Sequence, residues 1–139
     1  KGLRIMGLGG SIRYNSEETF QYTEREMRRR MRRLWFKAHR AGGIDLLLTH
    51  SPAAGLNDGN DRAHKGFACF NDLLEEYQPK WFVHGHVHLS YNANLPRVCT
   101  HGQTTVINAT ERYTFEIPDP DPVARKRFFW NDPAFPTKN

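Results

Sequence analysis

Two short, almost entirely apolar segments constrain the fold of this chain more than any other feature of its sequence. The first, IDLLLTH at 44–50, has Asp45 as its only charged residue, and the second, KWFVHG, occupies 80–85. Apolar runs of this length without alternation are typical of strands that are buried on both faces of a sheet covered by helices. We therefore expect two buried strands, each of which ends at a histidine.

Helical segments lie around these strands. Thr23 and Glu26 have the spacing of a capping box, which predicts a helix that begins after Thr23 and ends near Ala41. Five apolar residues recur at helical spacing and are expected on its buried face: Met27, Met31, Leu34, Trp35 and Ala38. The segment FACFNDLLEEY at 67–77 predicts a second helix.

The other elements are short. We expect four further strands, of which the last three follow one another as hairpins: 3–8, 97–101, 104–109 and 112–117. The polar segment 11–22 and the long segment 51–66 are expected to be loops, and a loop as long as the second is usually functional or mobile. The succession of strands and helices predicts a mixed α/β fold.

Length and composition indicate one globular domain. The chain has 139 residues, 38% of them apolar and 25% charged, which is enough for one core. No stretch approaches the ~18 to 20 apolar residues of a membrane span, and no secretory signal is present, so we expect a cytoplasmic protein without membrane contact. We assign 1–117 to the domain and 118–139 to a proline-rich basic tail with little fixed structure.

The cysteines give no sign of a site. Cys69 and Cys99 are the only two in the chain, and neither belongs to a Cys-x-x-Cys motif. Two inert thiols in a reducing compartment are therefore favoured over a disulfide framework or a zinc knuckle.

The histidines gather where the two buried strands end. His50 ends the first apolar segment, and His84, His86 and His88 come at the end of the second. Ligand sites in such sheets lie at the carboxyl ends of the strands, so both sets are expected at one sheet edge. In an extended segment His86 and His88 would face the same way, about 7 Å apart, and could bind one metal ion together or one ion each. His50 would be a third ligand.

The other histidines have different interpretations. His84 lies deeper in its strand, so we expect it to pack in the core or to support the ligands. His39 and His101 are expected to be solvated or satisfied by hydrogen bonds. His64, in the long loop, either caps the second helix or reaches the site, where as the candidate catalytic residue it would contact substrate or support the ligands.

The strand end LTHSP, followed by VHGHVH, resembles the last two motifs of the calcineurin-like metallophosphoesterase superfamily. The first of these motifs is a histidine after an apolar strand, and the second is Gly-His-x-His. GLGGSIRYN and TTVINAT resemble the corresponding segments of its small bacterial-type members, so the resemblance spans about 3–117. It implies part of a four-layer α/β/β/α sandwich.

The same resemblance implies a hydrolase that cleaves phosphate mono- or diesters with a metal-bound hydroxide. The family's pattern places one metal ion on His50 and His86 and a second on His88. Neutral imidazole suits Mn, Fe, Zn or Ni, so we expect two divalent transition-metal ions as cofactors and a phosphate ester as substrate.

Three motifs of the family are missing: Asp-x-His, Gly-Asp-x-x-Asp and Gly-Asn-His. Gly59-Asn60-Asp61 contains Gly-Asn without the histidine, and it follows His50 where the family's motif would precede it. We therefore expect the chain to be the C-terminal part of an enzyme, with the N-terminal half before Lys1 as its partner and with very low activity alone. The alternative is a naturally short protein that lost the chemistry.

The first helix is strongly basic. Lys and Arg number 20 against 15 Asp and Glu, and the segment 25–40 contains eight of the bases and one acid. Arginine clusters can bind phosphates, but apolar residues take one face of this helix and no aromatic residues interleave with its basic side. We therefore expect a solvated face and no binding of nucleic acid. The second functional hypothesis is a non-catalytic metal- or phosphate-binding module that docks on an anionic partner through this helix.

Overall fold

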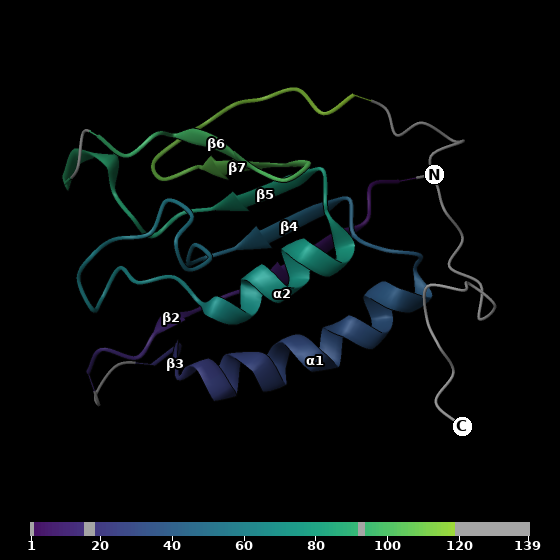
Figure 1. Cartoon of the computed structure of the whole chain (residues 1–139), viewed down its shortest axis with the longest axis horizontal. Helices are drawn as coiled ribbons and strands as arrows, with labels where there is room; N and C mark the ends of the chain where they lie inside the picture. The colour runs from purple at the N-terminus through teal and green to yellow at the C-terminus, as the bar shows by residue number, and fades with distance from the viewer. Residues whose placement is uncertain (1, 16–18, 92–93, 119–139) are drawn as a thin grey trace.

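Five strands form one sheet in the order β1-β4-β5-β7-β6 (Figure 1). In this order the strands are β1 (Ile5–Leu8), β4 (Leu46–Thr49), β5 (Trp81–His84), β7 (Thr104–Asn108) and β6 (Val98–His101). The first four strands are parallel, and β6 pairs antiparallel with β7. The structure is a computed structural model that describes residues 2–15, 19–91 and 94–118. The expected mixed α/β fold is confirmed, and the sheet is mostly parallel.

Two of the smaller predictions were wrong. The segment 112–117 forms no strand: Glu111 has φ 70°, the chain turns there, and Phe115 then packs against Trp81 with ring centroids 6.4 Å apart. The expected loop at 11–22 contains two short strands, β2 (Ser11–Ile12) and β3 (Gln21–Tyr22), which pair with each other in a separate sheet.

Helix α1 (Glu24–Arg40) begins and ends where the sequence predicts. The capping box is present: Glu26 N–H donates to Thr23 Oγ1 at 3.3 Å, and Thr23 N–H donates to the Glu26 carboxylate at 2.8 Å. Both bonds satisfy backbone donors that the first turn of a helix leaves unpaired. Trp35 departs from the prediction, because it is 40% exposed and its indole N–H donates to Glu76 at 2.8 Å.

The N-terminus of helix α2 (Ala68–Tyr77) is capped by a side chain of α1. Its own N-cap residue, Phe67, makes no side-chain capping bond. Instead, the Glu24 carboxylate accepts hydrogen bonds from the backbone N–H groups of Ala68 and Cys69, at 3.1 and 2.6 Å. The negative charge also faces the positive end of the α2 dipole. The starts of the two helices are therefore joined by one side chain.

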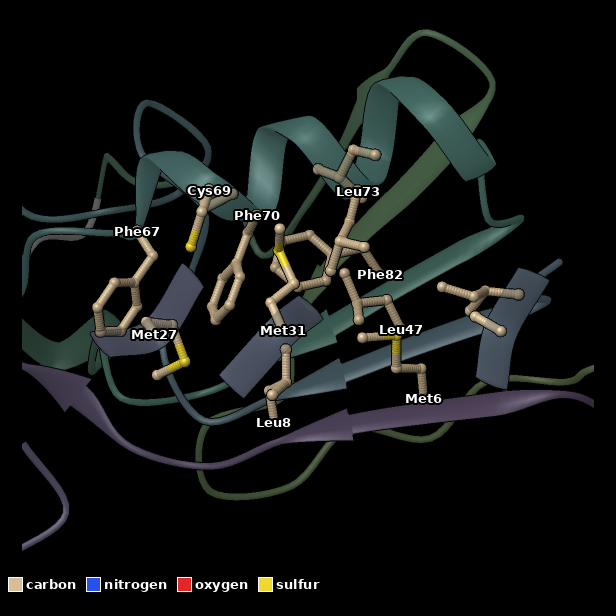
Figure 2. Close-up of a cluster of buried hydrophobic side chains, with 14 of the residues drawn as sticks. Met6, Leu8, Met27, Met31, Leu47, Phe67, Cys69, Phe70, Leu73 and Phe82 are labelled. Atoms are coloured by element: carbon tan, nitrogen blue, oxygen red, sulfur yellow. The ribbon is translucent and has the colours of Figure 1, made fainter. Parts of the chain in front are cut away.

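Both helices cover the same face of the sheet (Figure 1). The core lies between them and the strands, and Figure 2 shows the side chains that meet there from α1, α2, β1, β4 and β5. Phe67, Phe70 and Phe82 are fully buried. Each fully buried side chain of this size stabilises the fold by about 1.5–3 kcal/mol.

The opposite face of the sheet is apolar but incompletely covered. A smaller hydrophobic cluster, separate from the main core, lies on this face: Leu46, Trp81, Val83 and Ile107, against which the partly buried Phe115 packs. Ile5 and Leu48 on the neighbouring strands remain 59% and 47% exposed. The prediction that the segment 44–50 is buried on both faces is therefore wrong at Leu48. The described elements form two layers, with helices on one face of the sheet only.

The predicted tail at 118–139 lies, apart from Pro118, outside the described residues. Within the described part of the chain, no helix is long and apolar enough to cross a bilayer.

The shared cap at Glu24 gives a first prediction. Glu24→Ala leaves the N–H groups of Ala68 and Cys69 without an acceptor, so it should lower the free energy of unfolding by about 1–2 kcal/mol, measured by urea denaturation. Glu75→Ala is the matched control, since Glu75 is an exposed acid on α2, and it should change stability by less than about 0.5 kcal/mol. Equal effects of the two substitutions would contradict the capping role.

Candidate functional site

The two sets of histidines lie at the same sheet edge, as expected. Strands β4 and β5 are parallel neighbours, with Leu48 opposite Val83, so both point their carboxyl ends the same way. Immediately beyond them, Gly85 N–H donates to the His50 carbonyl at 3.0 Å. This backbone bond extends the pairing past the strands and fixes the start of the 85–88 loop beside His50.

The loop turns sharply at His86, and the premise of an extended segment was wrong. His86 has φ 69°, and Val87 N–H donates to the Gly85 carbonyl at 2.8 Å. A three-residue turn with this φ at its centre is the rare and strained form of the γ-turn. Val87 is buried, whereas His88 is exposed. Strand alternation therefore does not place His86 and His88 on one face.

His86 faces His50 instead. The His50 Nε2 and His86 Nδ1 atoms are 3.0 Å apart, and the ring centroids are 4.8 Å apart. The other ring nitrogen of His86, Nε2, lies 2.9 Å from the Ala63 carbonyl. A carbonyl only accepts, so His86 Nε2 carries a proton, and in the neutral ring Nδ1 then presents a lone pair toward His50. The tautomer of His86 is thus fixed by the loop that contains Ala63.

The electrostatics keep His50 neutral. Burial lowers its pKa below the ordinary value, and the repulsion that two protonated imidazoles at this distance would have lowers it further. A neutral imidazole has a lone pair on one ring nitrogen, which is the form that binds metal ions.

His64 also reaches this edge of the sheet, since its ring centroid lies 5.2 Å from that of His86. Its Nδ1 is 2.8 and 3.0 Å from the two carboxylate oxygens of Asp61. The hydrogen bond from His64 is the main reason that the pKa of Asp61 is lowered. Gly59 permits this arrangement, because a Cβ there would lie 2.6 Å from the His64 Cβ. The start of α2 is capped by Glu24, and the position of His64 beside His86 agrees with the interpretation that it reaches the site.

The sequence did not identify the residues that anchor the 85–88 loop to the end of β7. The Val87 carbonyl accepts hydrogen bonds from Asn108 Nδ2 at 2.8 Å and from Thr110 Oγ1 at 3.1 Å. Asn108 is the last residue of β7 and Thr110 lies two residues beyond it, and both are buried. The signal in the sequence was the position of two polar residues at the end of an apolar segment: Asn108 directly follows Ile107, and Thr110 follows Ala109.

His84 is a buried residue of the sheet. It is 1% exposed, its ring lies 5.4 Å from that of Phe82, and Nδ1 is 3.1 Å from the Gly85 carbonyl. Its Nε2 has no hydrogen-bond partner among the described residues. Burial lowers the pKa of His84 to about 4, so the ring is neutral at physiological pH.

The His50–His86 pair fits half of a metal site. Two imidazoles that share one ion at about 2.0–2.1 Å in tetrahedral geometry have their nitrogens roughly 3.4 Å apart, so the observed 3.0 Å requires only a small opening. The bond from His86 to the Ala63 carbonyl is the kind of support that metal-binding histidines have. Among the described residues, no group of three or more His, Cys, Asp or Glu side chains is arranged to hold an ion. The chain thus supplies two converging nitrogen ligands and not a complete coordination sphere.

Comparisons with known proteins place the similarity in about half of the chain. No family model matches the sequence. A UPF0046 protein of Caenorhabditis elegans is 38% identical over 73 residues, which are 48% of this chain and 24% of that protein. The human protein named metallophosphoesterase domain-containing protein 1 is 32% identical over 71 residues, 49% of this chain and 20% of that protein, and the mouse protein of the same name matches equally. The chain thus aligns with a quarter or less of the length of these curated relatives. The name of the human and mouse relatives agrees with the superfamily that the motifs resemble.

The buried His84 predicts a pH dependence of stability. In the unfolded chain His84 binds a proton near pH 6.5, whereas in the folded chain it does so only near pH 4. Protonation therefore favours the unfolded chain, and the free energy of unfolding should fall as the pH is lowered from 6.5 to about 4. The loss should amount to about 3 kcal/mol.

This loss should appear in urea denaturation with EDTA present. His84→Leu, which cannot titrate, should flatten the dependence between pH 6.5 and 4. Val83→Ala, on the opposite face of the same strand, should lower stability equally at all pH values and keep the slope. An unchanged slope in His84→Leu would show that His84 is not buried in its neutral form.

Proposed function

We propose that this chain carries the histidine-bearing, C-terminal part of a metal-dependent phosphoesterase that hydrolyses phosphate mono- or diesters. The observation that carries the proposal is the pair of ring nitrogens, His50 Nε2 and His86 Nδ1, 3.0 Å apart at the ends of two parallel strands. Relatives named for a metallophosphoesterase domain support the same reaction class.

In this proposal His50 and His86 hold one divalent transition-metal ion, and His88 contributes to a second. Imidazole nitrogen suits Mn, Fe, Zn or Ni. Such ions, when bound, make water a nucleophile at neutral pH and stabilise the charge on phosphoryl oxygens during in-line displacement.

The chain's own residues position and tune these ligands. Burial and repulsion from His86 lower the pKa of His50, so its ring is neutral at neutral pH. Its Nε2 can bind an ion when the proton that it donates to His86 Nδ1 moves to its own Nδ1. The Ala63 carbonyl orients the His86 ring by accepting a hydrogen bond from Nε2. Asn108 and Thr110 fix the adjacent backbone by donating hydrogen bonds to the Val87 carbonyl. We assign His64 to substrate contact, with Asp61 orienting its ring beside His86.

The open sheet face supports the other part of the proposal. In the complete protein, a second sheet from an N-terminal half covers Ile5, Leu48 and the apolar cluster around Trp81, which gives the four-layer α/β/β/α sandwich. Two side chains of this size at 59% and 47% exposure on adjacent strands mark an apolar surface that a soluble domain normally covers. The same half would supply the carboxylate ligands that the described residues lack.

The activity is tested on the product of the complete reading frame. With added Mn²⁺ it should hydrolyse bis(p-nitrophenyl) phosphate or p-nitrophenyl phosphate, whereas the 139-residue chain alone should be nearly inactive. His50→Ala and His86→Ala should each lower kcat/KM by more than about a hundredfold, because even residues that only support metal ligands cost 10–100-fold. Metal content, measured by elemental analysis of the purified variants, should fall in parallel.

His101→Ala is the matched control, since His101 ends β6 at the turn that leads to Thr104 in β7. It should keep both the rate and the metal content. Full activity of His86→Ala would refute the ligand assignment. Loss of activity with unchanged metal content would restrict the role of His86 to the substrate and would contradict the proposed metal site.

The sandwich has a separate test in stability. Leu48→Asp places a charge on the open face, so it should cost less than about 1 kcal/mol in the 139-residue chain and more than about 2 kcal/mol in the complete protein. Leu47→Asp, on the helix-covered face where Leu47 is 0% exposed, should unfold both proteins. Equal tolerance of Leu48→Asp in both proteins would contradict a covering sheet.

A further inference from the structure

An exposed phenylalanine lies at the centre of the basic side of α1. Phe36 is 64% exposed. Four arginines surround it on the helix surface. Arg29, Arg32 and Arg33 lie seven, four and three positions before Phe36, and Arg40 lies four positions after it. We call these five residues the basic-aromatic face. It corrects the sequence-based view that no aromatic residue interleaves with the basic side.

The arginines of this face are not neutralised. Within residues 2–15, 19–91 and 94–118, none of Arg29, Arg32, Arg33 and Arg40 forms an ion pair. Arg28, at the border with α2, differs because it pairs with both Glu24 and Asp72. Arg40 places its guanidinium 5.9 Å from the Phe36 ring centroid, which keeps a charge next to the exposed ring. The face thus combines unpaired positive charge with apolar surface.

A hollow of about 240 Å³ opens on this side of the helix. It is lined by Arg32, Trp35, Phe36 and His39. Trp35 is held in place by its bond to Glu76, so one wall of the hollow is fixed. The hollow has room for one large apolar side chain from a partner.

We propose that the basic-aromatic face binds an acidic protein segment that inserts one apolar side chain into this hollow. Carboxylates of the segment complement the arginines, and Arg and aromatic residues are the types enriched in protein interfaces and their energetic centres. The proposal stands apart from the phosphoesterase site, which lies at the carboxyl ends of the strands.

The charges of α2 favour a narrow partner over an extended anionic surface. Asp72, Glu75 and Glu76 are exposed on α2, next to α1. A membrane or a nucleic-acid duplex that lay across α1 would bring its phosphates within a Debye length of these carboxylates, about 8–10 Å. A short peptide along α1 avoids that repulsion and still uses the hollow.

The test compares labelled probes by fluorescence anisotropy with the 139-residue chain in about 0.1 M salt. The probes are a peptide of about ten Asp and Glu residues around one central Leu, the same peptide with Gly at the centre, and a single-stranded DNA of equal charge. The Leu peptide should bind about tenfold more tightly than the Gly peptide. Phe36→Ser should remove that difference, and Arg32→Glu should weaken binding of both peptides.

Two controls match these variants in type and exposure. Phe20→Ser removes an exposed phenylalanine, 75% accessible, outside the face, and Arg112→Glu reverses an exposed arginine at the other end of the chain. Both should bind like the unmodified chain. Equal affinity for the Leu and Gly peptides would overturn the proposal. So would tighter binding of DNA or of phosphatidylserine vesicles, or dimerisation of the chain that Phe36→Ser abolishes, because each identifies a different occupant.

Discussion

The parallel pairing of β4 with β5 is the interaction on which the site depends. It aligns the ends of two buried strands, and the bond from Gly85 N–H to the His50 carbonyl continues the pairing beyond the strands. Without it, His50 and the 85–88 loop would have no common position. The helices contribute indirectly: α1 and α2 bury one face of the sheet, and Glu24 holds their first turns together. The same core that stabilises the fold therefore sets the separation of the two imidazoles.

Sequence reasoning predicted the elements well where local chemistry decides them. The capping box at Thr23, the helical periodicity and the two apolar strands are local signals, and the common edge of His50 and His86 followed from strand direction alone. The predicted strand at 112–117 is absent because the chain turns at Glu111, and Phe115 packs on Trp81, a tertiary contact that no local pattern reports. Leu48 is exposed because covering the second face depends on what packs against the sheet, and no local pattern reports that.

The geometry within the site was harder to predict. Alternation of side chains assumes an extended backbone, and the turn at His86 breaks that assumption. The contacts of His86 with Ala63 and of Val87 with Asn108 and Thr110 join segments far apart in the chain, so spacing in the sequence gives no access to them. Phe36 was missed for a related reason: helical periodicity identifies the buried face and leaves the outer face unexamined.

The left-handed backbone at His86 has a consequence for affinity. A residue other than glycine in this conformation costs of order 1–3 kcal/mol, and it persists here because the surrounding hydrogen bonds over-determine it. That cost is met during folding, so a ligand arriving at the imidazole does not have to order the loop or rotate the ring. The site is in this sense preorganised, and its binding entropy should be less unfavourable than that of the same histidines on a flexible loop.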